Sequence, residues 1–336
     1  MRRYIMRTYL VTGGAGFIGS QLVAALTQRF PNDRVVVADL LRDGDKWKNL
    51  AGFPPDEIIA PNELLFWLEA NKSNLEMIIH LGAMTNTKEK NADMAVEQNV
   101  TFPKVLRNWA IENRKRFMFG SSAGVYGAGE HGFRDDMSLD YIKKLHPLNA
   151  YGWSKYAFDY HVARSLARGE PQPQQWVGLR FFNIYGPHEY HKGDQASVLC
   201  QIFPHVRANR PVNLFKSEHP DYSNGGQLRD FMYVMDCIHI LLWFIIHPEI
   251  SGMFNVGTGK ARSFQDLATA AFNAMGNKPL FHYIDMPPEV RTKYQYFTQA
   301  DISKLREVGY DAPFMTLEEG VKDYIQRFLN TDHMYL

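Results

Sequence analysis

The chain of 336 residues contains only two cysteines, Cys200 and Cys237, and they lack the spacing of metal ligands. Two thiols in so long a chain favour a reducing compartment, and both are expected to be small core residues rather than redox groups. The sequence therefore predicts neither a disulfide framework nor a metal site.

The chain also lacks an excess of charge and a long apolar run. It has 37 Lys and Arg against 36 Asp and Glu, so no basic surplus is available for nucleic acid or an anionic membrane face. The most apolar stretch, Ile238–Ile246, is too short to cross a bilayer and is expected to be a buried helix. The start, M-R-R-Y-I-M-R-T, carries no apolar stretch of a signal peptide. We therefore expect a soluble, cytoplasmic protein with no nucleic-acid or membrane partner.

Three glycines are regularly spaced after the first expected strand. The run Y-L-V-T-G-G-A-G-F-I-G-S-Q-L begins at Tyr9 as a strand, continues through Gly13, Gly16 and Gly19, and becomes helical from Phe17. Such a turn brings helix amides and the positive end of the helix dipole to a pyrophosphate. A second apolar run, Arg34–Ala38, ends in Asp39, where a carboxylate takes the ribose hydroxyls of a dinucleotide. Together these features favour a dinucleotide site over an unrelated glycine turn.

Strands and helices alternate along the first half of the chain. A doubly wound parallel sheet of the Rossmann type is therefore predicted, with a smaller α/β substrate domain. Helices are expected at 94–112, 149–168 and 234–247, and further strands at 77–83, 116–122 and 176–182.

The pattern changes after Pro187, where glycine- and proline-rich stretches interrupt it. We expect a dinucleotide-binding domain at 1–186 with a returning segment near 232–258. The substrate domain is then formed by 187–231 and 259–336.

Three polar residues suggest the chemistry. Tyr151 and Lys155 form Y-x-x-x-K on one face of a helix, so the ammonium can favour the phenolate. A phenol tuned in this way can take a proton from an alcohol while a hydride leaves the carbon. Ser122 ends a strand, where ligands bind in open α/β sheets, and its hydroxyl can bond the same oxygen. Taken alone, Y-x-x-x-K is more often a solvated helix face, and Ser122 can equally be a turn cap.

Together these motifs resemble the extended short-chain dehydrogenase/reductase superfamily. Asn99 in E-Q-N-V matches an Asn near the cofactor, and R-F-F-N-I-Y-G-P at 180–187 matches the segment that crosses to the substrate. R-D-F-M-Y-V at 229–234 matches the segment whose Arg holds a nucleotide-sugar diphosphate. The resemblance extends from about Tyr9 to Phe328.

Longer strings narrow the resemblance to the ADP-L-glycero-D-manno-heptose 6-epimerases. They are Y-G-P-H-E-Y-H-K-G-D-Q-A-S-V at 185–198, Y-Q-Y-F-T-Q-A-D at 294–301 and D-L-L-R-D-G-D-K-W-K-N-L at 39–50. The resemblance implies a triad of Ser122, Tyr151 and Lys155, with Lys192 as the second catalytic base. The implied substrate residues are Ser122, Asn183, Lys192, Asp194, Phe215, Arg229 and Tyr294. The implied cofactor residues are Gly13, Gly16, Phe17, Ile18, Gly19, Asp39, Leu40, Lys46, Leu81, Gly82, Ala83, Asn99, Tyr151, Lys155 and Ile184.

Charged residues near the expected ribose site bear on whether the cofactor is NAD or NADP. Asp39 favours the free 2′-hydroxyl of NAD and repels a 2′-phosphate, whereas Arg42 and Lys46 can neutralise one. The family binds NADP with the same Asp and a Lys that matches Lys46. We therefore expect NADP, with NAD as the alternative.

The resemblance implies an isomerase that inverts C6 of an ADP-heptose through a transient ketone and supplies lipopolysaccharide inner-core assembly. Inversion needs proton transfer on both faces, by Tyr151 and by Lys192; the alternative role for Lys192 is a fixed cation on the diphosphate. Ala123 and Gly124 replace the Asp-Glu pair of a 4,6-dehydratase, but a 4-epimerase of the same fold stays open. A non-catalytic dinucleotide-binding protein is disfavoured because Tyr151 and Lys155 are intact. The family forms homo-oligomers, typically pentamers, and apolar segments such as Leu241–Ile246 leave room for an interface.

Overall fold

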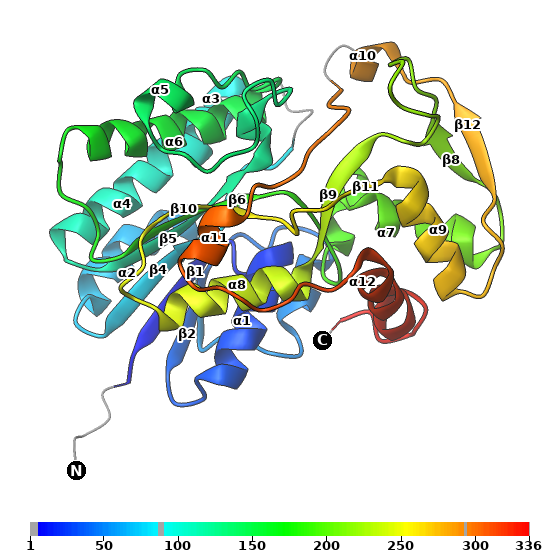
Figure 1. Cartoon of the computed structure of the whole chain (residues 1–336). Coiled ribbons are helices and arrows are strands. Elements are labelled where there is room, and N and C mark those ends of the chain that lie inside the picture. The colour runs from blue at the N-terminus through cyan, green and yellow to red at the C-terminus, as the bar shows by residue number, and fades with distance from the viewer. Residues whose placement is uncertain (1–5, 87–90, 292–293, 336) are drawn as a thin grey trace.

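A computed structural model describes residues 6–86, 91–291 and 294–335. Seven parallel strands form the sheet of a large lobe (Figure 1). They are β1 (Thr8–Thr12), β2 (Arg34–Ala38), β3 (Glu57–Ile59), β4 (Leu75–His80), β5 (Arg116–Ser122), β6 (Trp176–Phe181) and β10 (Gly252–Val256). Their order is β10-β6-β5-β4-β1-β2-β3, which confirms the predicted doubly wound sheet. The order reverses at β1 and β4, the position at which such sheets bind ligands beyond their carboxyl ends.

Helices cover both faces of this sheet because alternate strand residues point in opposite directions. Tyr9 and Val11 belong to one apolar cluster, and Leu10 between them belongs to another. The first cluster includes α1 (Phe17–Arg29) and α8 (Val234–Ile246). The second includes α2 (Leu64–Asn71), α4 (Phe102–Glu112) and α6 (Ala150–Ala167). Burial on both faces explains why the strands are nearly continuous apolar runs.

The helix expected at 94–112 is interrupted. It consists of α3 (Ala92–Val96), a π-helical turn η3 (Glu97–Thr101) and α4. Asn99 lies in this turn, and its side chain bonds both the N–H and the carbonyl of Met84. The spacing of apolar residues over the whole stretch does not reveal this π-helical turn. Such turns are frequent at functional sites. The remaining short helices of this lobe are η1 (Asp45–Leu50), η2 (Pro61–Glu63), η4 (Ala123–Tyr126), α5 (Leu139–Ile142) and α11 (Ser303–Glu307).

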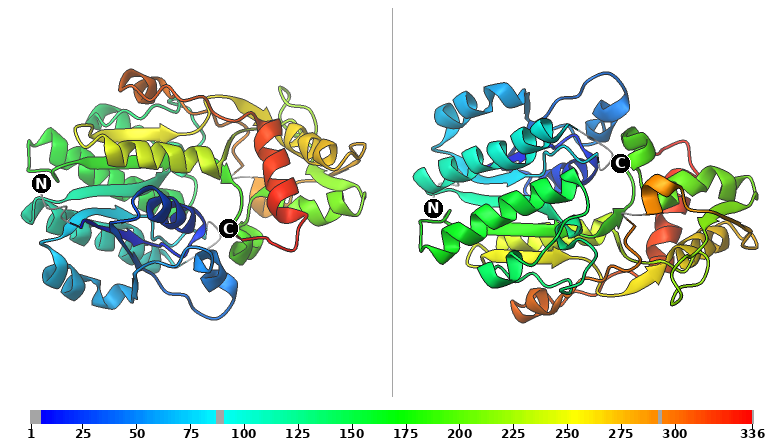
Figure 2. Two further views of the ribbon diagram at one scale, coloured as in Figure 1. Left: turned by 90° about the horizontal axis from the view of Figure 1, so that it is seen from below. Right: turned by 90° about the horizontal axis from the view of Figure 1, so that it is seen from above.

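A small lobe lies beside the large one (Figure 2). Its two sheets have the orders β11-β9-β7 and β12-β8. Their strands are β7 (Asn183–Tyr185), β8 (Val212–Phe215), β9 (Leu228–Tyr233), β11 (Ala261–Ser263) and β12 (Phe281–Ile284). The helices are η5 (Tyr190–Gln195), α7 (Val198–Arg207), α9 (Phe264–Ala274), α10 (Pro288–Arg291), α12 (Leu317–Tyr324) and η6 (Ile325–Leu329).

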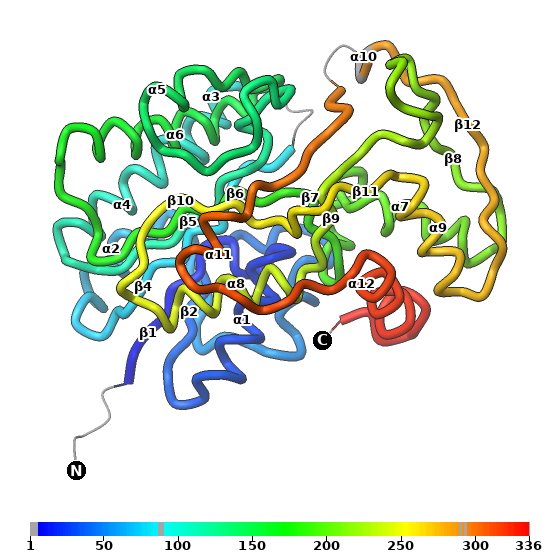
Figure 3. Tube along the Cα trace, in the orientation of Figure 1, coloured from blue at the N-terminus to red at the C-terminus, as the bar shows by residue number. Residues whose placement is uncertain are grey.

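The chain passes between the lobes several times (Figure 3). It leaves the large sheet after β6, returns through α8 and β10, and returns again at α11, where Lys304 Nζ donates to the Met253 carbonyl at 2.9 Å. The stretch 259–336, expected to be part of the substrate domain, thus contains one helix that packs on the large lobe. One apolar cluster continues from α1 and α8 into α9 and α12, so the two lobes share a core.

The apolar run 241–246 is not a free surface. Leu241, Phe244 and Ile245 are buried in the chain's own core, and Ile246 alone is exposed. Most of this run packs against α1 and the sheet, so an interface at this segment stays a prediction that would involve Ile246 and the half-buried Leu242 and Trp243. None of the described helices combines the length and apolarity of a membrane span.

Candidate active site

The glycine turn after β1 fits a dinucleotide. Gly13 has φ +68°, and a Cβ there would lie 2.5 Å from the Gly82 nitrogen. A Cβ on Gly19 would lie 2.1 Å from the Gly13 carbonyl oxygen. Helix α1 begins after Gly16 without a side-chain cap or an acidic residue in its first turn. Side chains are thus excluded where a pyrophosphate needs the backbone and the amides of Phe17 and Ile18.

The strand neighbouring β1 completes this cradle. Leu81 N donates to the Thr12 carbonyl at 3.1 Å, and Gly82 N lies 3.2 Å from Thr12 Oγ1. Gly82, followed by Ala83, therefore faces Gly13 directly. These residues lie where the sheet order reverses, which is the position expected for a bound dinucleotide.

Asp39 directly follows β2 and lies beside the glycine turn. The Ala15 amide donates to Asp39 Oδ2 at 2.9 Å, and the Leu40 amide donates to Oδ1 at 2.7 Å. Lys46 Nζ donates to the same Oδ1 at 2.6 Å and to the Leu40 carbonyl at 3.2 Å. Lys46 is thus paired with the carboxylate rather than free in solvent. The pair places one negative and one positive charge beside the glycine turn, where the sequence predicts the ribose.

Ser122, Tyr151 and Lys155 meet at the carboxyl end of β5. Helix α6 is capped at its N-terminus by Asn149, whose Oδ1 accepts from the Gly152 amide at 2.8 Å. Burial raises the pKa of Tyr151, and a hydrogen bond with Ser122 opposes this rise. Burial also lowers the pKa of Lys155 to about 8.

The direct contact of Lys155 differs from the expected one. Its Nζ donates to the Gly120 carbonyl of β5 at 2.8 Å, and Ser122 is the side chain that favours the Tyr151 phenolate. A shared helix face brings the two residues together, but the hydrogen bond of the ammonium is made with a backbone carbonyl of β5 rather than with the phenol.

A buried charged group lies behind this triad. Arg180 Nε donates to Asp159 Oδ2 at 2.9 Å, and Ser121 Oγ donates to the same oxygen at 3.0 Å. Asp159 is one helical turn after Lys155, and its negative charge raises the pKa of that lysine against the effect of burial. The Asp159 carboxylate therefore helps to keep Lys155 charged.

Asn99 links two segments of the site by hydrogen bonds. Its Nδ2 donates to the Met84 carbonyl and to Ser154 Oγ, both at 2.9 Å, while its Oδ1 accepts from the Met84 amide. The side chain fastens the segment after β4 to α6, three residues beyond Tyr151.

Lys192 lies in η5 against the first residue of α1. Its Nζ is 5.3 Å from the centroid of the Phe17 ring. Burial lowers the pKa of Lys192, and the nearby Glu189 carboxylate opposes that change. The lysine therefore lies beside the glycine turn, in surroundings that favour loss of its proton. Asp194, two residues later, is exposed.

The segment that carries Lys192 is anchored to the large lobe. His188 Nδ1 lies 2.9 Å from Ser20 Oγ, and Gln21 Nε2 donates to the Pro187 carbonyl at 3.1 Å. Asn49 Nδ2 donates to the carbonyls of Ala15 and His188 at 3.0 and 3.1 Å.

Sequence reasoning assigned no role to His188, Glu189 or Asn49. All three lie inside the segments 39–50 and 185–198, whose sequences carry the family resemblance. Those segments could therefore have pointed to a role for them. Only the fold shows that Asn49 and His188 join segments 139 residues apart, and that Glu189 accepts from Gly186 N and Ser197 within its own segment.

The remaining substrate residues lie in the small lobe. Arg229 is buried, with its guanidinium 5.2 Å from the Tyr294 ring centroid. The Phe215 and Tyr294 rings are 6.2 Å apart. Asn183 is exposed and Ile184 is partly buried at the start of the chain's passage between the lobes. The structure thus groups Phe215, Arg229 and Tyr294.

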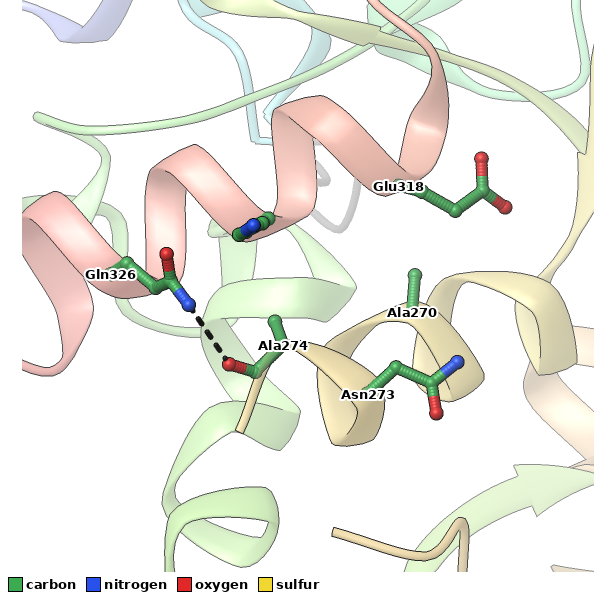
Figure 4. Close-up of a pocket in the computed structure, with 6 residues that line it drawn as sticks. Ala270, Asn273, Ala274, Glu318 and Gln326 are labelled. Atoms are coloured by element: carbon green, nitrogen blue, oxygen red, sulfur yellow. Dashed lines mark hydrogen bonds between the residues drawn. The ribbon is translucent and has the colours of Figure 1, made fainter. Parts of the chain in front are cut away.

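A surface cavity of about 290 Å³ lies elsewhere, between α9 and α12 (Figure 4). Gln326 Nε2 donates across it to the Ala274 carbonyl at 3.3 Å. It is lined by Ala270, Asn273, Ala274, Glu318, Lys322 and Gln326. None of the predicted site residues lines it, so the candidate site is the edge of the large sheet.

Comparisons with known proteins agree with this geometry. The model of the NAD dependent epimerase/dehydratase family matches residues 9–257. The chain is 42% identical over 323 residues to an ADP-L-glycero-D-manno-heptose-6-epimerase of Nitratidesulfovibrio vulgaris, covering 96% of this chain and 98% of that protein. It is similar in structure to the Helicobacter pylori ADP-L-glycero-D-manno-heptose-6-epimerase, with TM-score 0.78, 30% identity and 96% of each chain covered. A Thermus thermophilus UDP-glucose 4-epimerase in complex with NAD has TM-score 0.72 and 25% identity, over 95% of this chain and 97% of that one. The chain therefore belongs to the NAD dependent epimerase/dehydratase family and, within it, to the ADP-L-glycero-D-manno-heptose-6-epimerases, which are isomerases.

Proposed function

We propose that the protein interconverts ADP-D-glycero-D-manno-heptose and ADP-L-glycero-D-manno-heptose by transient oxidation at C6. The observation that carries this proposal is the convergence of two proton-transfer groups near one cofactor cradle. Tyr151 is bonded to Ser122 at the end of β5, and Lys192 lies over Phe17 at the start of α1. An epimerase that passes through a planar ketone needs an acid/base group for each face, whereas a simple dehydrogenase needs one.

Tyr151 is the first acid/base in this proposal. Ser122 holds the substrate oxygen and stabilises the phenolate by its hydrogen bond, and Lys155 supplies a fixed positive charge nearby. When bound, the nicotinamide would accept a hydride from C6 and return it. The glycine turn, Asp39, Gly82 and Lys155 would hold the dinucleotide.

Lys192 is the second acid/base. A desolvated lysine can lose its proton near neutral pH, and the burial of Lys192 acts in that direction. His188, Gln21 and Asn49 hold its segment on the large lobe, so the amine stays beside the cofactor cradle.

NADP is the proposed form of the cofactor. The Lys46 ammonium pairs with Asp39 and so offsets the charge that would repel a 2′-phosphate. The protein is expected to retain the dinucleotide between turnovers, because its release would leave the ketone stranded. Denaturing the purified protein and identifying the released dinucleotide checks this; NAD as the sole species would contradict the choice of NADP.

Arg229 is proposed to bind the diphosphate of the ADP-sugar, with Phe215, Tyr294 and Asn183 beside it and Asp194 on the loop of Lys192. A buried guanidinium held between aromatic rings is pre-oriented for bidentate contact with phosphate oxygens. The lobes are accordingly proposed as a dinucleotide-binding unit, 1–186 with 232–258, and a substrate unit, 187–231 with 259–336.

The test is incubation with ADP-D-glycero-D-manno-heptose in D₂O, followed by NMR. Conversion at C6 without deuterium at that carbon is expected, because the same hydride returns. Deuterium at C6 would contradict hydride transfer, and turnover of UDP-glucose instead would favour the 4-epimerase. Absence of turnover on either sugar would favour a non-catalytic dinucleotide-binding protein. Cytoplasmic location, pentameric assembly and supply of inner-core heptose complete the proposal.

A further inference from the structure

Three side chains with metal-ligating atoms converge next to the catalytic segments. The candidate atoms of Glu130, His131 and His146 all lie within 4.8 Å of one another, and the three residues are exposed. Sequence spacing gave no sign of this, because His146 is fifteen residues from His131 and joins it only in the fold.

The same three residues line a cavity of about 60 Å³ with Tyr126 and Lys144. The walls come from two segments that approach closely. A Cβ on Gly127 would lie 1.9 Å from the His146 carbonyl oxygen, so the backbones are in direct contact there. Gly129 N donates to the Tyr126 carbonyl and Gly132 N to the Gly129 carbonyl, which turns the chain and brings residues 130 and 131 back towards His146.

We propose that Glu130, His131 and His146 bind a divalent ion of the zinc class. Two imidazoles and one carboxylate are a common zinc ligand set, with a further position filled by water. Because nitrogen ligands are a poor match for Mg²⁺, that ion should not bind here.

The position of the site gives the ion a role. Residues 130 and 131 follow η4, which begins directly after Ser122, and His146 precedes Tyr151 by five residues. An ion held by both segments therefore links the connection after Ser122 to the connection before Tyr151. It stabilises the folded arrangement of these segments, and this role does not depend on which sugar the enzyme uses.

The experiment titrates chelator-treated full-length protein with Zn²⁺ and, separately, with Mg²⁺, by calorimetry and by thermal unfolding. One Zn²⁺ per chain should bind and raise the unfolding midpoint, and Mg²⁺ should do neither. The variant H131A/H146A should lose the calorimetric site and the shift in the midpoint. Since loss of an outer partner of a metal ligand already costs about 10–100-fold in affinity, loss of two ligands should cost about 100-fold or more.

Two further variants complete the test. H239A/H282A removes two exposed histidines elsewhere and should bind Zn²⁺ like the unmodified protein. Lys144→Gln removes the one positive side chain that lines the cavity and should tighten binding. Equal Zn²⁺ binding by H131A/H146A, or loss of binding in H239A/H282A, would overturn the proposal. The unfolding midpoint of each variant without metal shows whether it is folded.

Discussion

The two regions that meet at the candidate site are held in different ways. In the large lobe, Ser122 and Lys155 are fixed by a strand end and by a backbone carbonyl of that strand. Lys192 and Arg229 depend instead on contacts between distant segments, such as Ser20 with His188 and Arg229 with Tyr294. The first region is built by the strand ends of one sheet and the turns and helices next to them, and it suits the hydride-transfer chemistry proposed above. The second is built from long-range contacts and suits recognition of one particular substrate.

The largest expected effect separates the two proposed bases. Tyr151→Phe removes the phenol and keeps the ring, and Lys192→Met removes the charge at similar length. Each variant should lose about 10²–10⁴-fold in epimerisation rate, because a positioned acid/base typically contributes that much. Rates measured by NMR at C6 check this, with the unfolding midpoint as a control for folding.

Lys192→Met also distinguishes the two roles of that lysine. Near-unmodified epimerisation would make it a bystander, and a raised KM with unchanged kcat would make it the cation on the diphosphate.

A smaller effect is expected from the glycine turn, on the side built from local geometry. Gly19→Ala places a Cβ 2.1 Å from the Gly13 carbonyl and should displace the turn, so that the purified protein carries little dinucleotide. Overpacking of this kind costs about 1–3 kcal/mol of stability. Gly276→Ala is the control outside the cradle, since it strains a glycine with φ +70° and its Cβ would meet nothing within 4 Å. Equal dinucleotide content in both variants would contradict the assignment of the cradle.

This contrast also explains what could be predicted from the sequence. The glycine turn, Asp39, Ser122 and Y-x-x-x-K are short motifs whose geometry follows from one strand or helix, so the sheet and its edge were predicted correctly. The pairing of Lys46 with Asp39, the Lys155 contact with Gly120 and the anchoring of His188 join separate segments, and composition or periodicity carries no signal for them. The π turn at Asn99 was missed because it adds only one residue to a helical turn, and the spacing of apolar residues over the whole helix hardly changes.

Arg229→Lys should have an intermediate effect in the small lobe. Lysine keeps the charge but cannot offer two parallel N–H groups, so KM for the ADP-sugar should rise about tenfold, the equivalent of about 1.4 kcal/mol, with little change in kcat. Steady-state kinetics check this. An unchanged KM would place the diphosphate elsewhere, for which the loop at 218–226 is the next candidate.

The smallest effect is on pH dependence. Lys155 is charged below its pKa of about 8 and neutral above it, so the rate should fall to half near pH 8 and continue to fall as the pH rises. Lys155→Arg keeps the charge at high pH, so its slower reaction should lack this alkaline decline. The same decline in both proteins would assign it to another group.

The most direct test of a two-base site uses an ADP-sugar with an aldehyde at C6. Two such molecules can dismutate on the enzyme, one hydrated aldehyde being oxidised to the acid and the other aldehyde reduced to the alcohol, without inversion at a carbon. Dismutation needs proton transfer in one orientation only. Of the variants Tyr151→Phe and Lys192→Met, one should therefore keep dismutation while losing epimerisation, and the double variant should lose both. If both single variants lose dismutation together with epimerisation, or if Lys192→Met retains both reactions, the account of two bases on two lobes is contradicted.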